Sequence, residues 1–431
     1  MLSAEDNVLL TRTGPNTPMG EYFRRFWQPV ALSSELLPDG APLRVRILGQ
    51  DWVAFRSADG RVGLVDPRCA HRGADLFFGR NEEGGLRCIY HGWKYDHAGR
   101  AAELPNVPSG SAYHDKIAIA ACPTREAGDM VWAWLGPPEA ADTPLPALEF
   151  MLVPPGRRYV TKRLQQCNWA HSIEGALDTA HFSFLHMPAP ARSSNDAMTA
   201  AADEARIRWL RNDPLPRFSL AEHECGFVVG GARDADPGGL YWRITQFMLP
   251  SHSITPSAMP GETLYGYSWV PIDDVSCWIY VYAWHPEQDL PLEERARYER
   301  GGFGQFAALG PGFVPLRHRG NDYLIDRDAQ KTVSFTGVAG IAEQDAMAQD
   351  SQGLIADRTR EHLSPTDMAV VRFRRMLLGG ARELAAGTPP AAARASGAYR
   401  VRGGGALAPS DMSFEAVMVE RFGSVTGRIE A

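Results

Sequence analysis

Two Cys/His pairs between positions 69 and 91 constrain this 431-residue chain more than any other feature. Cys69 and His71 form a Cys-x-His pair, and Cys88 and His91 follow as Cys-x-x-His. Thiol and imidazole groups this close in sequence suit zinc or an iron–sulfur cluster. Zinc sites usually contain a Cys-x-x-Cys pair. A two-iron cluster with Cys on one iron and His on the other instead takes one Cys and one His from each of two loops. The spacing favours the cluster, with a zinc staple as the alternative.

Composition and charge narrow the class of protein. The formal net charge is -7 and no cluster of Lys and Arg occurs, which argues against nucleic acid or an anionic membrane as main partner. No stretch approaches the roughly 18 apolar residues of a membrane span, and residues 1–14 lack the apolar core of a signal peptide. Six Cys do not form a disulfide framework in a chain of this length. We therefore expect a globular, cytoplasmic protein of two or three domains.

Local patterns predict how the chain is organised around the Cys/His pairs. Residues 40–66 contain short runs rich in β-branched and aromatic residues, and Ala58-Asp59-Gly60 predicts a hairpin turn between two strands. A Pro-rich break at 135–150 predicts a domain boundary. Beyond it, residues 165–187 predict one helix. Aromatic residues at every second position of 277–284 predict a strand.

A second group of possible metal ligands lies on the expected helix. Glu174, Asp178 and His181 occupy positions i, i+4 and i+7 and so share one helical face. His186 follows His181 by five residues, about 140° around an ideal helix, so both imidazoles reach one ion only if the helix widens or ends between them. Pro188 makes an end credible. Two His and one carboxylate form the facial triad of non-haem Fe(II) oxygenases; ordinary helical histidines are the alternative.

Both groups of residues carry a resemblance to a known family. The stretch CAHRGADLFFGRNEEGGLRCIYHGWKYD, residues 69–96, resembles the Rieske motif of aromatic-ring oxygenases. The segment DTAHFSFLH, residues 178–186, is similar to their Asp-x-x-His-x-x-x-x-His segment. The resemblance extends to residues 13–30 and 357–375. The chain therefore resembles the oxygenase (alpha) subunit of Rieske non-haem iron aromatic ring-hydroxylating oxygenases, in the phthalate dioxygenase-like group.

The resemblance implies two iron cofactors. Four side chains would bind a Rieske [2Fe–2S] cluster: Cys69, His71, Cys88 and His91. Two neutral imidazoles in place of thiolates would raise the reduction potential of such a cluster. Three side chains would bind a mononuclear Fe(II): His181, His186 and Asp345. Asp350 is the alternative for the carboxylate ligand.

The resemblance also gives Asp178 a role between subunits. In these oxygenases the matching Asp links a Rieske His of one subunit to an iron-ligand His of the next. Asp178 would thereby connect His91 of the partner subunit to His181. An enzyme built this way would act as a homo-oligomer, a trimer or a hexamer. A solvent-facing helical acid is the alternative reading of Asp178.

The implied fold class is α+β, with three parts. Residues 1–40 would form an N-terminal segment that packs on the catalytic domain. Residues 41–145 would form an all-β Rieske [2Fe–2S] domain. Residues 146–431 would form the catalytic mononuclear iron domain with a helix-grip fold, in which an antiparallel sheet surrounds a long helix.

Two Arg residues are candidates for binding an anionic substrate. A planar guanidinium matches a carboxylate bidentately. Arg243 shares one face of an expected strand with Tyr241 and Thr245, and Arg217 lies in DPLPRFSL. A structural salt bridge is the alternative for each. The phthalate dioxygenase-like group includes oxygenases for phthalate, isophthalate, chlorobenzoate and phenoxybenzoate, so the implied substrate is an aromatic carboxylate.

The chain is thus expected to be the terminal oxygenase of a Rieske system in aromatic catabolism. It would use O2 to dihydroxylate or hydroxylate its substrate, with NADH-derived electrons from a separate FMN and [2Fe–2S] reductase. One alternative is a Rieske monooxygenase or O-demethylase with the same ligand residues. Another is a Rieske electron carrier without the mononuclear iron.

Overall fold

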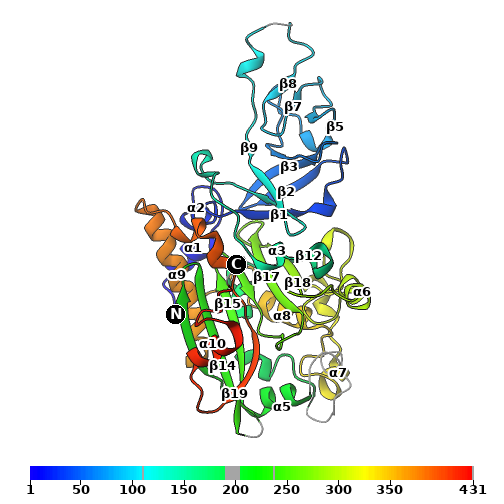
Figure 1. Ribbon diagram of the computed structural model, residues 1–431. Helices are drawn as coiled ribbons and strands as arrows, with labels where there is room; N and C mark the ends of the chain where they lie inside the picture. Colours follow the sequence, from blue (N-terminus) through cyan, green and yellow to red (C-terminus); the bar gives the residue numbers. More distant parts are fainter. Residues whose placement is uncertain (109–110, 190–203, 236–237, 430–431) are drawn as a thin grey trace. The chain divides into compact units, whose positions relative to one another are not determined.

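The computed structural model describes residues 1–108, 111–189, 204–235 and 238–429 (Figure 1). The chain divides into two compact units. The small unit is Thr13–Thr143, and the large unit combines Met1–Arg12 with Pro144–Ala431. The second boundary between the two units, between Thr143 and Pro144, lies inside the Pro-rich break at 135–150.

The boundary between the two units near the N-terminus differs from the boundary expected from sequence. Residues 1–40 were expected to pack on the catalytic domain, but only Met1–Arg12 groups with the large unit. The physical reason is strand pairing: β1 (Gln28–Leu32) pairs antiparallel with β11 (Met130–Ala133). Backbone hydrogen bonds therefore hold this part of the N-terminal segment inside the small unit.

The small unit is built from three antiparallel sheets. Their strand orders are β1–β11–β10, β2–β3–β4–β9 and β5–β6–β7–β8. The further strands are β2 (Leu43–Ile47), β3 (Gln50–Arg56), β4 (Val62–Val65), β5 (Arg80–Glu82), β6 (Gly85–Arg87), β7 (Lys94–Tyr95), β8 (Ala101–Glu103), β9 (Ala121–Cys122) and β10 (Thr124–Ala127). Among the described residues of this unit the one α-helix is α2 (Pro18–Phe23). The expected hairpin turn at residues 58–60 is confirmed, because it joins β3 to β4.

The large unit is organised around an eight-stranded antiparallel sheet. Its order is β12–β18–β17–β16–β15–β14–β13, and β19 pairs with β15. The strands are β12 (Arg158–Gln165), β13 (Arg217–His223), β14 (Gly226–Ala235), β15 (Gly239–Met248), β16 (His252–Ile254), β17 (Leu264–Pro271), β18 (Cys277–Trp284) and β19 (Gly404–Pro409). The expected strand over residues 277–284 is confirmed as β18.

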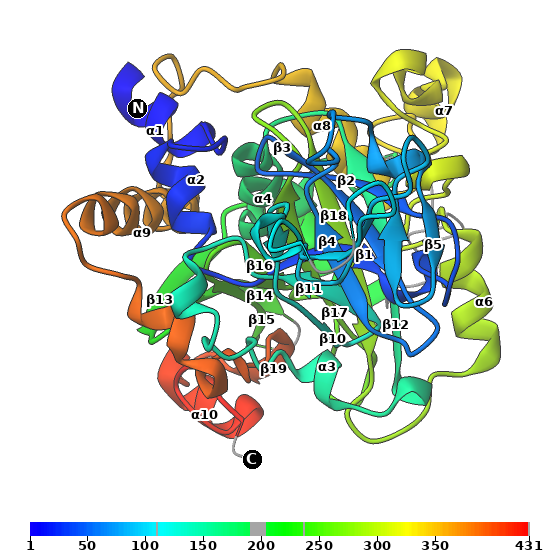
Figure 2. The same ribbon diagram turned by 90° about the horizontal axis from the view of Figure 1, so that it is seen from above.

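The large unit also contains nine α-helices among its described residues, and one of them, α8, carries the candidate ligand Asp345. They are α1 (Ala4–Thr11), α3 (Glu149–Leu152), α4 (Trp169–Leu177), α5 (Glu204–Asn212), α6 (Leu292–Arg300), α7 (Arg327–Thr332), α8 (Ile341–Ser351), α9 (Met368–Ala385) and α10 (Phe414–Phe422). Helix α4 packs against β17, α8 and α9, and Figure 2 shows α4 and α8 lying beside the sheet. None of the described helices has the length and apolar character that crossing a bilayer needs.

The single helix expected over residues 165–187 is wrong. Strand β12 reaches Gln165, and α4 begins at Trp169 after Asn168, whose side chain accepts a hydrogen bond from the Ala170 N–H. The helix ends at Leu177, because Asp178 adopts an extended conformation at φ -87° and ψ 115°. A separate 3-10 turn, Ala180–Ser183, carries His181. The helical face expected to join Asp178 and His181 is therefore interrupted.

Glu174 on α4 is a buried carboxylate that ties three segments of the large unit together. Arg358 donates to it at 3.1 and 3.0 Å, and Arg374 of α9 donates at 2.7 and 3.0 Å. Burial alone would raise the pKa of Glu174, but the two guanidinium groups hold it below its usual value. The carboxylate is therefore ionised and pairs with both cations.

We expect Glu174→Gln to lower the free energy of unfolding by about 3–5 kcal/mol at neutral pH, because it leaves the buried guanidinium of Arg358 without a carboxylate partner among the described residues, while Arg374 keeps Glu361. The folded-state pKa of Glu174 is lowered, so its stabilising effect is present at neutral pH and is lost as the pH falls through that pKa. Wild type and variant should therefore converge in acid. Denaturant unfolding at several pH values checks this.

Glu222→Gln is the control, because Glu222 is a half-exposed partner of Arg372. Its removal should cost less than about 1 kcal/mol. Equal losses in the two variants would contradict the role of the buried pairings.

Candidate active site

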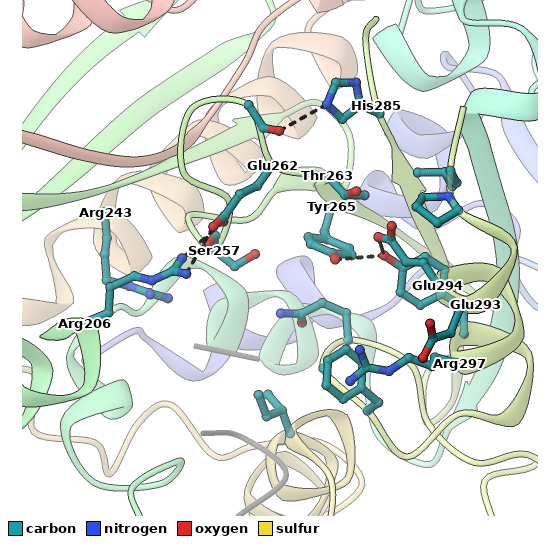
Figure 3. Close-up of a pocket in the computed structure, with 18 of the residues that line it drawn as sticks. Arg206, Arg243, Ser257, Glu262, Thr263, Tyr265, His285, Glu293, Glu294 and Arg297 are labelled. Carbon is teal, nitrogen blue, oxygen red and sulfur yellow. Dashed lines mark hydrogen bonds and ion pairs between the residues drawn. The ribbon is translucent and has the colours of Figure 1, made fainter. Parts of the chain in front are cut away.

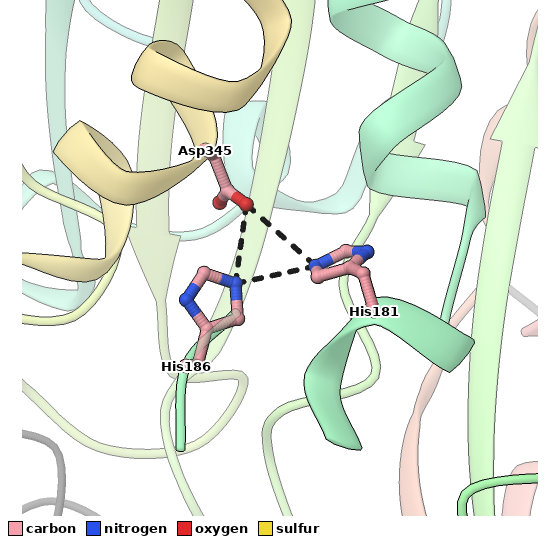
Figure 4. Close-up of side chains that lie close together, drawn as sticks. All are labelled: His181, His186 and Asp345. Carbon is pink, nitrogen blue, oxygen red and sulfur yellow. Dashed lines mark hydrogen bonds and ion pairs between the residues drawn. The ribbon is translucent and has the colours of Figure 1, made fainter. Parts of the chain in front are cut away.

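Three side chains of the large unit bring their ligand atoms together (Figure 4). His181 lies in the 3-10 turn after α4, His186 follows it, and Asp345 lies on α8. The Nε2 atoms of His181 and His186 are 3.2 Å apart, and Oδ1 of Asp345 lies 3.6 Å from the first and 3.1 Å from the second. Bonds of about 2.1 Å at right angles place ligand atoms roughly 3 Å apart. These distances fit three ligand atoms that bind one metal ion from the same side.

His186 is oriented by a partner that the sequence did not reveal. Its Nδ1 lies 2.7 Å from Oε1 of Gln344, and Nε2 of Gln344 donates to the Val338 carbonyl at 2.8 Å. Because the amide oxygen can only accept, Nδ1 carries the proton and Nε2 presents its lone pair towards Asp345. His186 is buried, so this orientation is fixed by packing as well as by the hydrogen bond.

His181 is oriented in the same way by Asp178. Nδ1 of His181 lies 3.4 Å from Oδ2 of Asp178, and Oδ1 of Asp178 accepts from the Ala180 N–H at 2.6 Å. Burial would raise the pKa of Asp178, but hydrogen bonding and charge from His181 leave it below its usual value. An ionised Asp178 beside Nδ1 leaves Nε2 of His181 free to bind a metal.

Asp345 and Asp350 share helix α8 but have different surroundings. Burial opposes ionisation of Asp345, yet the neighbouring His186 and then His181 hold its pKa below the usual value. Asp350 is buried elsewhere, where Gln165 donates to it at 2.6 Å and the Tyr323 hydroxyl also donates. Of the two carboxylates, only Asp345 groups with the histidines among the described residues.

The two Cys/His loops of the small unit share one backbone pattern. In the first, the Cys69 N–H donates to the Ala74 carbonyl at 2.9 Å, and the Gly73 N–H donates to the Cys69 carbonyl at 2.8 Å. In the second, the Cys88 N–H donates to the Trp93 carbonyl at 2.8 Å, and the Gly92 N–H donates to the Cys88 carbonyl at 3.0 Å. The two glycines have φ of 71° and 74°, a conformation that other residues rarely adopt.

The side chains of these loops form a donor set suited to a cluster. Cys69 and Cys88 are buried, and the rings of His71 and His91 lie 4.5 Å apart between centroids. Nδ1 of His71 is buried and has no hydrogen-bond partner among the described residues, as a metal-binding nitrogen would. The Tyr95 hydroxyl lies 3.2 Å from Sγ of Cys69. Two thiols and two imidazoles from facing loops match the ligand set of a Rieske cluster.

The large unit contains a cavity of about 660 Å³ (Figure 3). Its lining includes Arg243, Phe182 and the aromatic side chains of Tyr265, Tyr298 and Phe303. A smaller pocket of about 40 Å³ is lined by His181 and Asp345. The two cavities share four lining residues, which are Phe182, Arg243, Ser257 and Gln305. A molecule in the large cavity therefore lies next to the His/Asp site.

Arg243 is a buried cation with incomplete pairing. It is 3% exposed, its Nε donates to Oγ1 of Thr179 at 2.8 Å, and its guanidinium carbon lies 3.8 Å from the centroid of the Phe182 ring. Its Nη2 has no hydrogen-bond partner among the described residues. No ion pair joins it to a carboxylate in the described part of the chain. A buried guanidinium in this state favours an anionic ligand.

The other expected anchor, Arg217, lies elsewhere. Its side chain is 56% exposed and pairs with Asp234 at 2.6 Å, and it is not among the described residues that line either cavity. Arg206 does line the large cavity, although its position in sequence gave no sign of it. Of the two expected anchors, Arg243 lines both cavities and Arg217 lines neither among the described residues, and Arg206 is a further Arg in the lining of the large cavity.

Comparison with known proteins identifies the family. Residues 26–120 match the Rieske [2Fe-2S] domain, and residues 133–411 match the family described as LigXa C-terminal domain like. The phthalate 4,5-dioxygenase oxygenase subunit of Pseudomonas putida is 38% identical over 406 residues, covering 90% of this chain and 88% of that protein. The chain belongs to the Rieske non-haem iron oxygenases, in the phthalate dioxygenase-like group.

Further relatives agree with this Rieske oxygenase assignment. The 3-chlorobenzoate-3,4-dioxygenase oxygenase subunit of Comamonas testosteroni is 32% identical over 438 residues, covering 98% of this chain and 99% of that protein. The crystal structure of dicamba monooxygenase bound to dicamba shares the fold, with a TM-score of 0.58 at 18% identity over 85% of this chain and 99% of that chain. The enzyme's cofactors are accordingly a Rieske [2Fe–2S] cluster and a mononuclear iron.

We expect Gln344→Leu to weaken iron binding at the mononuclear site by about 10–100-fold, because Nδ1 of His186 loses the acceptor that orients it. The cluster in the small unit should be retained. Metal analysis after dialysis against a graded chelator, with the visible spectrum of the cluster, measures both.

Gln352→Leu is the matched control, because Gln352 is an exposed residue at the C-terminal end of the same helix. It should retain iron as wild type does. Iron loss from both variants, or from neither, would show that the contact between Gln344 and His186 does not support the site.

Proposed function

We propose that this oxygenase hydroxylates or dihydroxylates an aromatic carboxylate in aromatic catabolism. The observation that carries the proposal is Arg243, a buried guanidinium without a carboxylate partner among the described residues, in a cavity next to the His/Asp site. The names of relatives agree: phthalate 4,5-dioxygenase, 3-chlorobenzoate-3,4-dioxygenase and phenoxybenzoate dioxygenase. A carboxylate on Arg243 would place its ring between the aromatic walls and the metal site.

We assign the two cofactors to the ligand sets built above. Cys69, His71, Cys88 and His91 would hold the cluster, and His181, His186 and Asp345 would hold the iron. When bound, the cluster supplies single electrons and the iron supplies the site of dioxygen activation. Asp178 and Gln344 keep the two imidazoles in the tautomer that leaves Nε2 free. Arg243 orients the substrate, while Tyr265, Tyr298 and Phe303 exclude water from its ring.

We further propose that the enzyme works as a homo-oligomer, a trimer or a hexamer, supplied with NADH-derived electrons by a separate FMN and [2Fe–2S] reductase. Asp178 would join His91 of the partner subunit to His181, so that electrons cross between subunits. A carboxylate that already contacts the iron-side imidazole at 3.4 Å is suitably placed for that role. A cytoplasmic location accords with this dependence on NADH.

We expect Arg243→Gln to raise KM for an aromatic carboxylate by at least about tenfold, because one charge-assisted hydrogen bond contributes roughly 1.5–3 kcal/mol. Steady-state oxygen uptake and product formation with a cognate reductase measure kcat and KM. The panel should contain phthalate, isophthalate, 3-chlorobenzoate and 3-phenoxybenzoate.

Arg217→Gln is the matched control, since it removes an exposed Arg outside the cavity. It should leave KM near the wild-type value. Turnover of a neutral arene with no carboxylate turned over would overturn the proposal.

Asp178→Asn should retain both metal sites and lose most of the electron transfer between them, by at least about a hundredfold, because an amide cannot accept from two imidazoles as a carboxylate does. Metal analysis and rapid mixing of the reduced enzyme with substrate and oxygen separate the two effects. Full turnover with wild-type iron content would rule out the bridge.

A monooxygenase or O-demethylase is the second candidate function. The 5,5'-dehydrodivanillate O-demethylase oxygenase subunit of Sphingobium sp. is 30% identical over 91% of this chain and 83% of that protein. The ligand set would be the same, so product analysis distinguishes the two: a dihydrodiol from ring dihydroxylation, or formaldehyde from O-demethylation.

A further inference from the structure

Two guanidinium groups lie at one side of the large cavity, and their pairing differs. Figure 3 shows Arg206 and Arg243 there, while Glu293, Glu294 and Arg297 lie at the opposite side. Arg206 is close enough for its charge to add to the effect of burial in lowering the pKa of Arg243. Judged by their positions alone, the two guanidinium groups could each bind one carboxylate of a dicarboxylate substrate.

The guanidinium of Arg206 already forms an ion pair with Glu262. Nη1 and Nη2 of Arg206 donate to the two carboxylate oxygens of Glu262, each at 3.2 Å, and Nη1 also lies 3.3 Å from the Ser257 carbonyl. The Met259 N–H donates to the same carboxylate at 2.8 Å, which fixes Glu262 in place. Among the described residues, Nε of Arg206 and Nη2 of Arg243 have no hydrogen-bond partner, but only Arg206 pairs with a carboxylate. Of the two cations, Arg243 is therefore the one whose charge is left for a ligand.

Among the described residues, the rest of the cavity lining offers no substitute for Arg206. The charged side chains of this described lining comprise four acids and three Arg: Glu262, Asp289, Glu293, Glu294, Arg206, Arg243 and Arg297. The guanidinium carbon of Arg297 lies 3.6 Å from the centroid of the Phe303 ring, on the side of the cavity that also carries Glu293 and Glu294. The described lining therefore has no excess positive charge for a second substrate carboxylate. That carboxylate would lose its hydrating water without gaining an ion pair with a cation.

We propose that Glu262 sets the charge specificity of this oxygenase. By holding Arg206, it leaves the single anchor Arg243 and selects aromatic monocarboxylates over dicarboxylates. The inference rests on the proposed function, because it specifies which carboxylates the same cavity accepts. Glu262 acts here through Arg206, as a residue that determines specificity rather than as a group that touches the reacting atoms.

The test compares 3-chlorobenzoate with isophthalate, which differ only in the meta substituent, chlorine or a second carboxylate. Wild-type holoenzyme with a cognate reductase should show at least about a tenfold higher kcat/KM for 3-chlorobenzoate. Glu262→Gln should reduce that ratio by at least about tenfold, mainly through a lower KM for isophthalate. Equilibrium binding of isophthalate to the anaerobic holoenzyme should tighten by a similar factor.

Two further variants separate release of Arg206 from a general loss of negative charge. Glu293→Gln removes one acid from the same lining without touching Arg206 and should shift the ratio much less. The double variant Arg206→Gln/Glu262→Gln keeps the net charge of the wild type and should lose the gain for isophthalate. A gain in the double variant, or an equal gain in Glu293→Gln, would overturn the proposal.

Failure of this inference is distinguishable from failure of the proposed function. Wild-type enzyme that turns over isophthalate as well as 3-chlorobenzoate, with Glu262→Gln unchanged in its ratio, would disprove the role of Glu262 while leaving an aromatic carboxylate as substrate. Wild-type enzyme that turns over neutral arenes but neither carboxylate would disprove both.

Discussion

The arrangement of the catalytic unit depends on one buried contact, the carboxylate of Asp345 against the Nε2 atoms of His181 and His186. These groups lie more than 150 positions apart in sequence, so the contact exists only if α8 packs closely on the end of α4. Gly175 permits that approach: a Cβ at this position would lie 2.4 Å from the Gln349 side chain of α8. A larger residue would displace the Gln349 side chain and with it the hydrogen bond that Gln349 accepts from Ser172.

Much of the metal chemistry could be predicted from sequence because it is local. The proposed cluster ligands Cys69, His71, Cys88 and His91 lie within 23 consecutive residues, and their spacing alone favoured a cluster over zinc. The His181/His186 pair is equally local. The carboxylate was different: periodicity gave no preference between Asp345 and Asp350, and the choice rested on resemblance. The structure separates them, because one faces the histidines and the other faces Tyr323 and Gln165.

Residues that meet only through tertiary structure could not be found in this way. Gln344 orients His186 and Glu262 holds Arg206, but neither partner is near the other in sequence. The helix expected over 165–187 failed for a related reason. Its apolar pattern continues past Leu177, yet Asp178 uses its carboxylate to accept from the Ala180 N–H and the His181 ring instead of continuing the helix. A side chain that competes with the backbone for hydrogen bonds overrides the local pattern.

That interruption places the two functional groups of the site on one short segment. Thr179 follows Asp178; its hydroxyl accepts from Nε of Arg243 at 2.8 Å and its carbonyl accepts from Arg233 at 2.6 Å. His181 lies two residues further on, with Asp178 at its Nδ1. The support of the proposed substrate anchor, Arg243, and the support of the proposed metal ligand, His181, are therefore adjacent residues. A regular helix here would turn Thr179 and His181 to different faces, so the end of α4 at Leu177 is what allows one segment to hold both.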